Sequence, residues 1–195
     1  AHAYWVPWVQ SFQEINASAS TNSRCSMGVI WIPQRRVRTL TLSISVTGAK
    51  PDYPAKRPYV RCAIQAAGQT LLTVVFAHLI SGWPSEATRD VKFIADAMRD
   101  SVPQGTSIML VGDLNINLLL NQQRGRFDTV LANNGLKLYN TGQPTQQSGG
   151  ELDACVFYDA NNQYQNVAVN WGPQWKQPGN ASDHAVISYD VTIPA

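Results

Sequence analysis

Two apolar runs of this sequence end on residues that can do chemistry. Residues 107–112 lead directly into Asp113 and, two positions later, Asn115. Residues 70–77 end at His78 in the same way. A carboxylate, an amide and an imidazole can bind ions, hold a phosphate or transfer protons. The simpler alternative is that Asp113 and Asn115 only turn the chain, because both residue types favour turns for their local backbone hydrogen bonds.

Similar residues open two later apolar runs. Asp153 begins the run 153–158, and Asp183 and His184 begin the last one. In a layered domain, strand ends on one side form a common rim where distant segments meet. This set of groups suits phosphoester hydrolysis. Carboxylates can orient water or bind a divalent ion, imidazoles can transfer protons, and an amide can hold the phosphate. Taken singly, each residue has a structural alternative: a lone histidine at a strand end is more often structural, and Ser182, Asp183 and His184 also fit a simple cap.

Short runs of strand-forming residues must position these groups. The run 38–46 alternates between apolar and polar residues, which predicts a half-buried strand with one wet face. The runs 70–79 and 107–112 are apolar on both faces and predict central strands that are covered on both sides. The other predicted strands are 26–32, 58–64, 152–159, 165–171 and 184–191.

Two helices are expected between the strands. The first follows a start signal at 84–86 and has apolar residues at helical spacing, namely Val91, Ile94, Ala95 and Met98. The second covers 123–134, with Gly135 as its C-terminal stop and with Phe127, Val130 and Leu131 facing inward. Many strands with a few helices predict an α/β or α+β layered domain.

Composition fits one folded domain over residues 1–195, with 44% hydrophobic and 14% charged residues. No apolar run approaches the roughly 20 residues that a membrane-spanning helix needs. The first 61 residues hold eight Lys/Arg against two acidic residues, a net charge of +6 within a chain of net charge +2. This basic part suits a polyanionic partner such as a phosphate backbone. The alternative is that Arg35, Arg36 and Arg38 form a solvated turn.

The spacing of the three cysteines fits no zinc motif. A bridge between Cys25 and Cys62 that leaves Cys155 free, and three reduced thiols, both remain open.

Four segments carry a resemblance to a known family. In order they are VVFAHLISG, IMLVGDLNIN, PTQQSGGELDACVFYD and SDHAVISYDV. They resemble the motifs of the endonuclease/exonuclease/phosphatase, or deoxyribonuclease I-like, superfamily, and within it most closely those of the catalytic B subunits of cytolethal distending toxins. The resemblance covers roughly residues 26–195. It implies a four-layer α/β sandwich, in which two packed β-sheets are flanked by helices.

The resemblance also implies roles for individual residues. His78 and His184 are expected to flank the scissile phosphate, with His184 as general base or acid and His78 stabilising the developing charge. Asp183 is expected to orient His184 or to bind metal, and Asp153 to orient or polarise the site near His78. Asp113 is expected to align the attacking water.

Substrate, cofactor and setting follow from the same resemblance. Asn115 is expected to hold a phosphate oxygen and Arg57 to contact the phosphate backbone. The implied activity is that of a DNA-nicking endonuclease that depends on a divalent cation, Mg²⁺. The implied setting is a secreted toxin that travels with carrier subunits and acts inside a target cell.

The front of the chain departs from the family pattern. The family places a long segment between a metal-binding Gln-Glu and the strand that matches 26–32, whereas here eleven residues separate Glu14 from Ser26. Three explanations remain: Glu14 is the metal ligand in a shortened front half, the true front half has been removed, or the chain keeps the fold without metal-dependent catalysis. Pro7 makes residues 1–12 an edge or irregular segment.

Two other functions share these features. A phosphoinositide phosphatase or a sphingomyelinase-like enzyme acts on the same anionic group and would show an apolar rim. Candidate rim residues are Trp5, Trp8, Trp83, Trp171 and Trp175. A non-catalytic binding module would keep the fold without turnover. Residues 170–180 are expected to form an exposed loop that suits a carrier contact.

Overall fold

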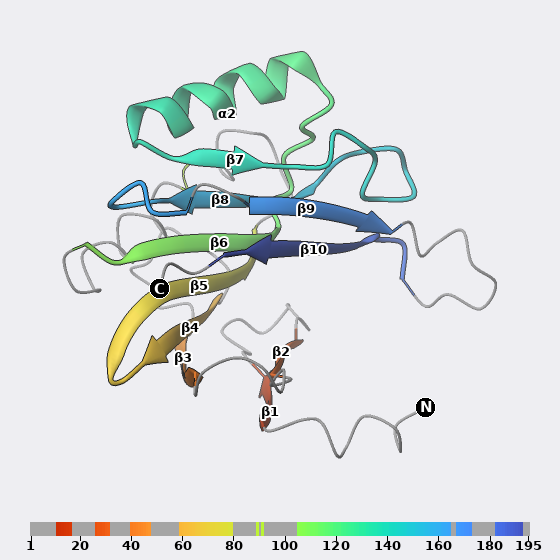
Figure 1. Ribbon diagram of the computed structural model, residues 1–195. Helices are drawn as coiled ribbons and strands as arrows, with labels where there is room; N and C mark the ends of the chain where they lie inside the picture. Colours follow the sequence, from red (N-terminus) through yellow and green to blue (C-terminus); the bar gives the residue numbers. More distant parts are fainter. Residues whose placement is uncertain are drawn as a thin grey trace.

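The fold is dominated by one six-stranded sheet. The computed structural model describes residues 11–16, 26–31, 40–47, 59–79, 89, 91, 105–164, 167–172 and 182–192, with the backbone alone at 11–16, 26–31, 40–47, 59, 60 and 66. The strands of the large sheet, in spatial order, are β3 (Leu40–Thr47), β4 (Tyr59–Ala66), β5 (Gln69–His78), β6 (Ser107–Asp113), β8 (Asp153–Tyr158) and β7 (Lys137–Tyr139) (Figure 1).

Two further sheets have two antiparallel strands each. One pairs β1 (Ser11–Asn16) with β2 (Ser26–Trp31), and the other pairs β9 (Val167–Gly172) with β10 (Val186–Val191). In the large sheet, β5 and β6 run parallel, whereas the other neighbouring strands are antiparallel.

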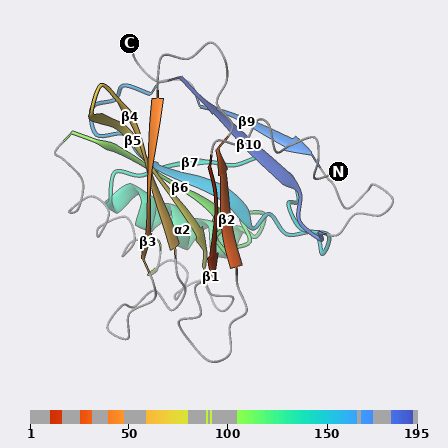
Figure 2. The ribbon, with the colours of Figure 1, turned by 90° about the horizontal axis from the view of Figure 1, so that it is seen from below.

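The large sheet is covered on both faces, as its doubly apolar central strands require. Alternate residues of β5 and β6 project to opposite faces because the side-chain period of a strand is two. One set packs with the helix α2 (Asn121–Asn133) in a first core, which includes Val75, Ala77, Ile108, Leu110, Phe127 and Leu131. The other set packs with β9 and β10 in a second core, which includes Leu72, Met109, Val111, Phe157, Val167, Tyr189 and Val191. The chain is therefore an α/β sandwich of two packed sheets with a helix (Figure 2).

Helix α2 ends as its sequence predicts. Gly135 has a φ of +64°, a left-handed conformation that glycine adopts without strain. The Leu136 N–H donates to the Leu131 carbonyl at 2.9 Å, and the Gly135 N–H donates to the Ala132 carbonyl at 3.2 Å. These two bonds close the last turn in the manner of a Schellman motif and satisfy carbonyls that would otherwise lack partners.

Most predicted elements are confirmed with ends shifted by at most two residues. The runs 70–79 and 107–112 are the central strands β5 and β6. The predicted helix 123–134 is α2, in which Phe127 and Leu131 are buried. Of the other predicted helix, Arg89 and Val91 are helical, and the rest lies outside the described residues. The sequence interpretation missed β1 and β7.

Within the part of the chain that the structure describes, no helix is long and apolar enough to cross a membrane.

Candidate active site

Three strand-end residues form a row across the centre of the large sheet. His78 lies opposite Asp113 in the β5–β6 register, and Asp113 lies opposite Asp153 in the β6–β8 register. Residues that face each other across a strand pair project to the same side of the sheet. By the alternation along each strand, this is the side that carries the second core. Backbone pairing alone therefore brings these three groups together beside β10.

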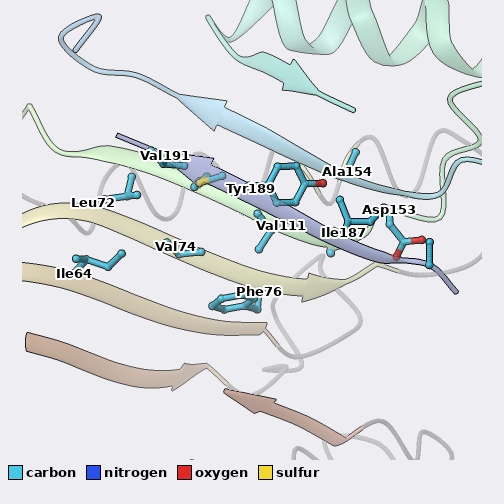
Figure 3. Close-up of a pocket in the computed structure, with 13 residues that line it drawn as sticks. Ile64, Leu72, Val74, Phe76, Val111, Asp153, Ala154, Ile187, Tyr189 and Val191 are labelled. Atoms are coloured by element: carbon cyan, nitrogen blue, oxygen red, sulfur yellow. The ribbon is translucent and has the colours of Figure 1, made fainter. Parts of the chain in front are cut away.

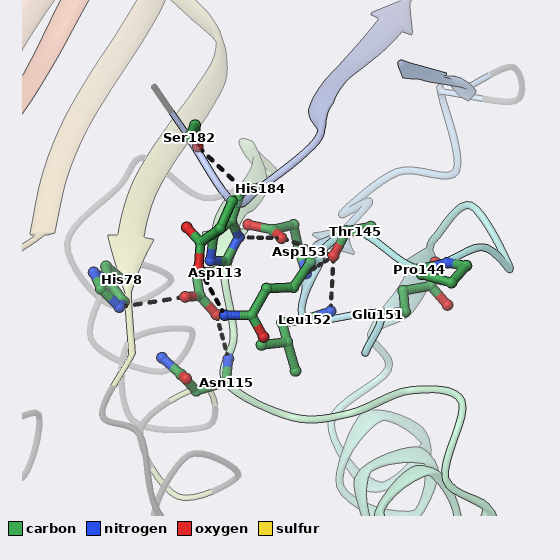
Figure 4. Close-up of polar contacts among 12 residues, drawn as sticks. His78, Asp113, Asn115, Pro144, Thr145, Glu151, Leu152, Asp153, Ser182 and His184 are labelled. Atoms are coloured by element: carbon green, nitrogen blue, oxygen red, sulfur yellow. Dashed lines mark hydrogen bonds and ion pairs between the residues drawn. The ribbon is translucent and has the colours of Figure 1, made fainter. Parts of the chain in front are cut away.

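The first polar pair joins His78 and Asp113. The Nε2 atom of His78 lies 3.3 Å from Oδ2 of Asp113 (Figure 4). The other oxygen of Asp113 accepts a 2.8 Å hydrogen bond from the backbone N–H of Asn115, which has a left-handed φ of +51°. Asp113 and Asn115 thus do turn the chain, and the same carboxylate also contacts an imidazole.

The side chain of Asn115 helps to fix this turn. Its Nδ2 group donates to the Leu79 carbonyl at 2.7 Å. A side-chain amide carries two N–H donors and a carbonyl acceptor, so this bond uses one of its donors. The geometry is compatible with a second role for Asn115 as a hydrogen-bond donor.

The second polar pair joins His184 and Asp153. The Nδ1 atom of His184 lies 2.8 Å from Oδ2 of Asp153. An imidazole that donates its Nδ1–H to a carboxylate has its Nε2 lone pair available as a base while it is neutral. The sequence interpretation placed Asp153 near His78 and let Asp183 orient His184. Instead, Asp113 faces His78, because the strand register puts Asp113 between His78 and Asp153.

The electrostatic surroundings favour the protonated form of His184. Partial burial on its own lowers the pKa of this imidazole. The hydrogen bond to Asp153 and the negative charges of Asp153, Asp113 and Asp183 outweigh that effect and raise the pKa above its ordinary value.

Exposure separates the two kinds of side chain. The side chains of His78 and His184 are 41% and 27% exposed, whereas those of Asp113 and Asp153 are 15% and 17% exposed. The imidazoles therefore reach solvent, and each contacts a carboxylate that is less exposed than the imidazole itself. Such an arrangement suits the transfer of protons to a bound molecule.

Asp183 lies beside the loop that flanks the site. Its backbone carbonyl accepts a 2.8 Å hydrogen bond from the Gln147 N–H, and its carboxylate is 3.4 Å from the side-chain amide of Gln146. Gln146 also forms an isolated antiparallel bridge with His184. These contacts hold the segment 182–185 next to the loop 144–150.

Sequence reasoning assigned no role to two buried residues of this region. Thr145 is fully buried, and its hydroxyl donates to Oδ2 of Asp153 at 2.7 Å. Glu151 is also fully buried, and its carboxylate accepts hydrogen bonds of 2.7 to 2.9 Å from Asn140, Thr141 and Gly142. Both lie in the segment 144–159 that carries the family resemblance, but their partners are 8 to 11 residues away along the chain, so the segment alone did not indicate these contacts.

An apolar cavity adjoins the site. It has a volume of about 570 Å³ and lies between the large sheet and β10 (Figure 3). Its walls include Leu72, Phe76, Val111 and Tyr189, and Asp153 lies at one end. One side of the Asp153–His184 pair therefore borders apolar groups, which strengthens electrostatic interactions there.

The described side chains do not form a protein cage for a metal. Nowhere among them do three His, Cys, Asp or Glu residues gather closely enough to hold an ion. Mg²⁺ nevertheless binds through one or two carboxylates, with waters and substrate phosphates as its other ligands. The exposed carboxylate of Asp183 fits that donor chemistry.

Several predicted residues cannot be placed at the site. Arg57 lies outside the described residues. Glu14 lies in β1 opposite Gly28, with only its backbone described. Of the five tryptophans, only Trp171 has a described side chain, and its indole N–H donates to the Pro144 carbonyl at 2.9 Å. Trp171 thus packs against the loop beside the site. Cys62 and Cys155 are free, buried thiols, so Cys62 is not bridged.

Comparison with solved structures identifies the fold. The chain is similar to cytolethal distending toxin from Actinobacillus actinomycetemcomitans, with a TM-score of 0.61 and 16% identity over 89% of this chain and 65% of the other. Its similarity to CdtB, the biologically active subunit of that class of toxin, has a TM-score of 0.61 and 16% identity over 90% of this chain and 64% of the other. An endonuclease/exonuclease/phosphatase family protein from Leptotrichia buccalis matches with a TM-score of 0.59 and 16% identity over 95% of this chain and 71% of the other.

These likenesses define the class of the protein by its fold. The chain has a deoxyribonuclease I-like fold, as its motifs predicted. It spans slightly less than two thirds of the length of the two toxin chains. No family model matches the sequence, and a search of curated proteins finds no significant match.

Proposed function

We propose that this protein is a metal-dependent phosphodiesterase that nicks DNA and acts as a toxin subunit. The observation that carries the proposal is the pair of imidazole–carboxylate contacts, His78–Asp113 and His184–Asp153, on one rim of the sandwich. The deoxyribonuclease I-like fold, which is shared with CdtB, supports it.

In the proposed reaction His184 is the general base. Asp153 accepts the Nδ1–H of His184, so that Nε2 takes a proton from the attacking water. Because the base must be unprotonated, turnover is expected to fall as the pH drops below the raised pKa of His184. His78 donates to an oxygen of the phosphate as negative charge develops, while Asp113 holds the imidazole. The water oxygen bonds to phosphorus, the bond from phosphorus to the leaving sugar oxygen breaks, and that oxygen takes a proton from solvent.

Asn115, Asp183 and Glu14 complete the proposed site. The second N–H of Asn115 is the proposed donor to a phosphate oxygen, since the bond to Leu79 uses only one of its two N–H groups. Asp183 and Glu14 are the proposed ligands of Mg²⁺, and Arg57 is a proposed contact to the DNA backbone. A bound divalent cation would neutralise charge on the phosphate.

Secretion and association with carrier subunits are part of the same proposal. They rest on the likeness to the cytolethal distending toxin structures, which shows a shared fold.

A lipid phosphodiester is the second candidate substrate. The apolar cavity beside Asp153 is the observation that favours it, because an acyl chain could occupy an apolar space next to the phosphate site. Such an enzyme would cleave phospholipid in vesicles and would leave DNA intact.

Plasmid nicking tests the proposal directly. Supercoiled plasmid is incubated with the protein and Mg²⁺, beside an EDTA control and the variants His184→Ala, Asp183→Asn and Glu14→Ala. Loss of nicking with EDTA and with His184→Ala is expected. Glu14→Ala and Asp183→Asn are expected to raise the Mg²⁺ concentration needed for half-maximal rate.

The same preparation is offered sphingomyelin and phosphoinositide vesicles. Metal-dependent turnover of lipid without nicking would replace DNA by lipid as the substrate. Binding of DNA or lipid without any turnover would make the protein a non-catalytic member of the fold. Nicking that survives His184→Ala would overturn the assigned base.

A further inference from the structure

We infer that Thr145 is a positioning residue that fixes the Asp153–His184 pair; this inference rests on the proposed function. The hydroxyl of Thr145 and Nδ1 of His184 meet the same carboxylate oxygen, at 2.7 and 2.8 Å. Two donors that converge on one oxygen leave the carboxylate a single orientation that satisfies both.

The hydroxyl of Thr145 has its full set of partners. Besides donating to Asp153, it accepts hydrogen bonds from the backbone N–H groups of Leu152 at 2.9 Å and Asp153 at 3.0 Å. A hydroxyl has one proton and two lone pairs, so all its bonding capacity is used. It therefore holds both the backbone and the side chain of Asp153, and it fixes the rotamer of that residue (Figure 4).

The backbone of Thr145 also holds the segment that carries His184. Its carbonyl accepts a 2.7 Å hydrogen bond from the N–H of Ala185, the residue directly after His184. Its own N–H donates to the Gly150 carbonyl at 2.9 Å, which closes the loop. One buried residue thus ties the loop, the strand β8 and the segment before β10 together at the point where acid and imidazole meet.

Two substitutions at Thr145 distinguish the effect of its hydroxyl hydrogen bonds from the effect of its packing. Thr145→Val keeps the shape and removes the hydroxyl, whereas Thr145→Ser keeps the hydroxyl and removes a methyl group. Thr73→Val is the matched control, since Thr73 is also buried but lies in the middle of β5, five residues before His78. Thr145→Val is expected to lower kcat by about 10- to 100-fold with little change in KM, because a misoriented base slows the chemical step more than binding.

A double substitution tests whether Thr145 acts through Asp153. In an Asp153→Ala background, Thr145→Val is expected to change kcat by less than about twofold, since its partner is already absent. If the loss of kcat in the double variant equalled the product of the two single losses, Thr145 would act independently of Asp153, and the inference would be overturned. Thr145→Ser is expected to restore most of the rate that Thr145→Val loses.

An NMR measurement decides the inference without turnover. The hydrogen-bonded Nδ1–H of His184 should give a downfield proton signal, assigned by its absence in His184→Gln. The signal is expected in the unmodified protein, in Thr145→Ser and in Thr73→Val, and to be lost in Thr145→Val. Its persistence in Thr145→Val would overturn the inference.

The two failures are distinguishable. If no form turns over a phosphodiester, the proposed function fails, and the Nδ1–H signal still decides whether Thr145 fixes the pair. If Thr145→Val does not fold, Thr145→Ala carries the same comparison with a smaller side chain.

Discussion

At the scale of single residues, the site joins solvent-reaching imidazoles to carboxylates that are mostly shielded. The carboxylates are held by short hydrogen bonds from within the fold, from Asn115 to Asp113 and from Thr145 to Asp153. The imidazole orientations are therefore set by the protein before any ligand arrives, and preorganisation of this kind lowers the cost of reaching a transition state.

The raised pKa of His184 links protonation to stability. Because the folded-state pKa lies above the unfolded value of about 6.5, the stabilisation is fully present below that pH and is lost as pH rises through the folded pKa. His184→Gln is therefore expected to lower the free energy of unfolding more near pH 5.5 than near pH 8.5. Urea unfolding at the two pH values measures this difference. An equal loss at both, or a pH dependence that survives Asp153→Asn, would contradict it.

Substitution of Glu151 measures how much a buried, fully hydrogen-bonded carboxylate contributes to the free energy of unfolding. Glu151→Leu leaves the N–H groups of Thr141, Gly142 and Asn140 without their acceptor. An unsatisfied buried donor costs about 1 to 3 kcal/mol; because Asn140 and Thr141 are half-buried and Gly142 is exposed, a total loss of about 1 to 3 kcal/mol in the free energy of unfolding is expected. Glu151→Gln, which keeps one acceptor oxygen, should lose less. The exposed Asp128→Ala is the control and should change stability by less than about 1 kcal/mol.

At the scale of elements, the site depends on how closely β5 and β6 approach. Gly112, one residue before Asp113, has a φ of +136°, and a Cβ there would lie 2.0 Å from the Ala77 carbonyl oxygen. A side chain at this position would push apart the parallel pair that places His78 against Asp113.

Gly112→Ala is therefore expected to lower the free energy of unfolding by at least about 3 kcal/mol, from backbone strain and steric overlap. Gly125 lies inside α2 and contrasts with Gly112, because no described atom outside its own helix backbone and chain neighbours lies within 4 Å of an added Cβ. Gly125→Ala should stabilise by about 0.5 to 1 kcal/mol. Thermal melting of both variants measures the contrast. Equal changes in stability for the two variants would show that β5 and β6 leave room for a side chain at Gly112.

The periodicity of the sequence predicted the secondary-structure elements better than it predicted the contacts between them. The alternation in 38–46 and the glycine stop after 123–134 are local signals, and the strand β3 and helix α2 follow them closely. β7 has three residues, too few for a period to be visible. β1 was missed because its SFQEIN pattern has only two apolar residues.

The candidate site shows the same limit. The sequence indicated that His78, Asp113, Asp153 and His184 stand at strand ends, and the structure brings them to one rim. The expected place of Asp153 was near His78, whereas Asp153 contacts His184 and Asp113 contacts His78, because the pairing depends on the register between strands distant in sequence. Thr145 and Glu151 lie in the motif segment 144–159, but their roles depend on loop contacts that the order of residues in the motif does not specify.

At the scale of the whole molecule, two thiols, those of Cys62 and Cys155, are buried away from solvent. Cys155 is fully buried in the second core, and burial raises the pKa of its thiol; burial also raises the pKa of Cys62 to about 11. A thiol in such surroundings reacts only after the sheets separate, because the thiolate is the reactive form.

Labelling of Cys155 should therefore report global unfolding. In a Cys25→Ser, Cys62→Ser background, its labelling rate is expected to give the same opening free energy as urea unfolding. Gly112→Ala should accelerate labelling in proportion to its loss of stability. Labelling of the native protein at the rate of the unfolded chain would contradict the prediction.

The alignment of His78, Asp113 and Asp153 across three strands makes the site depend on the number of residues in each strand. Strand side chains alternate between faces, so one residue inserted into the middle of β6 would turn Asp113 toward α2 and away from His78. Two inserted residues would restore the face but move the carboxylate along the strand by about 6 to 7 Å. Length changes in this lineage should therefore be confined to the connecting loops, while the central strands keep a constant number of residues.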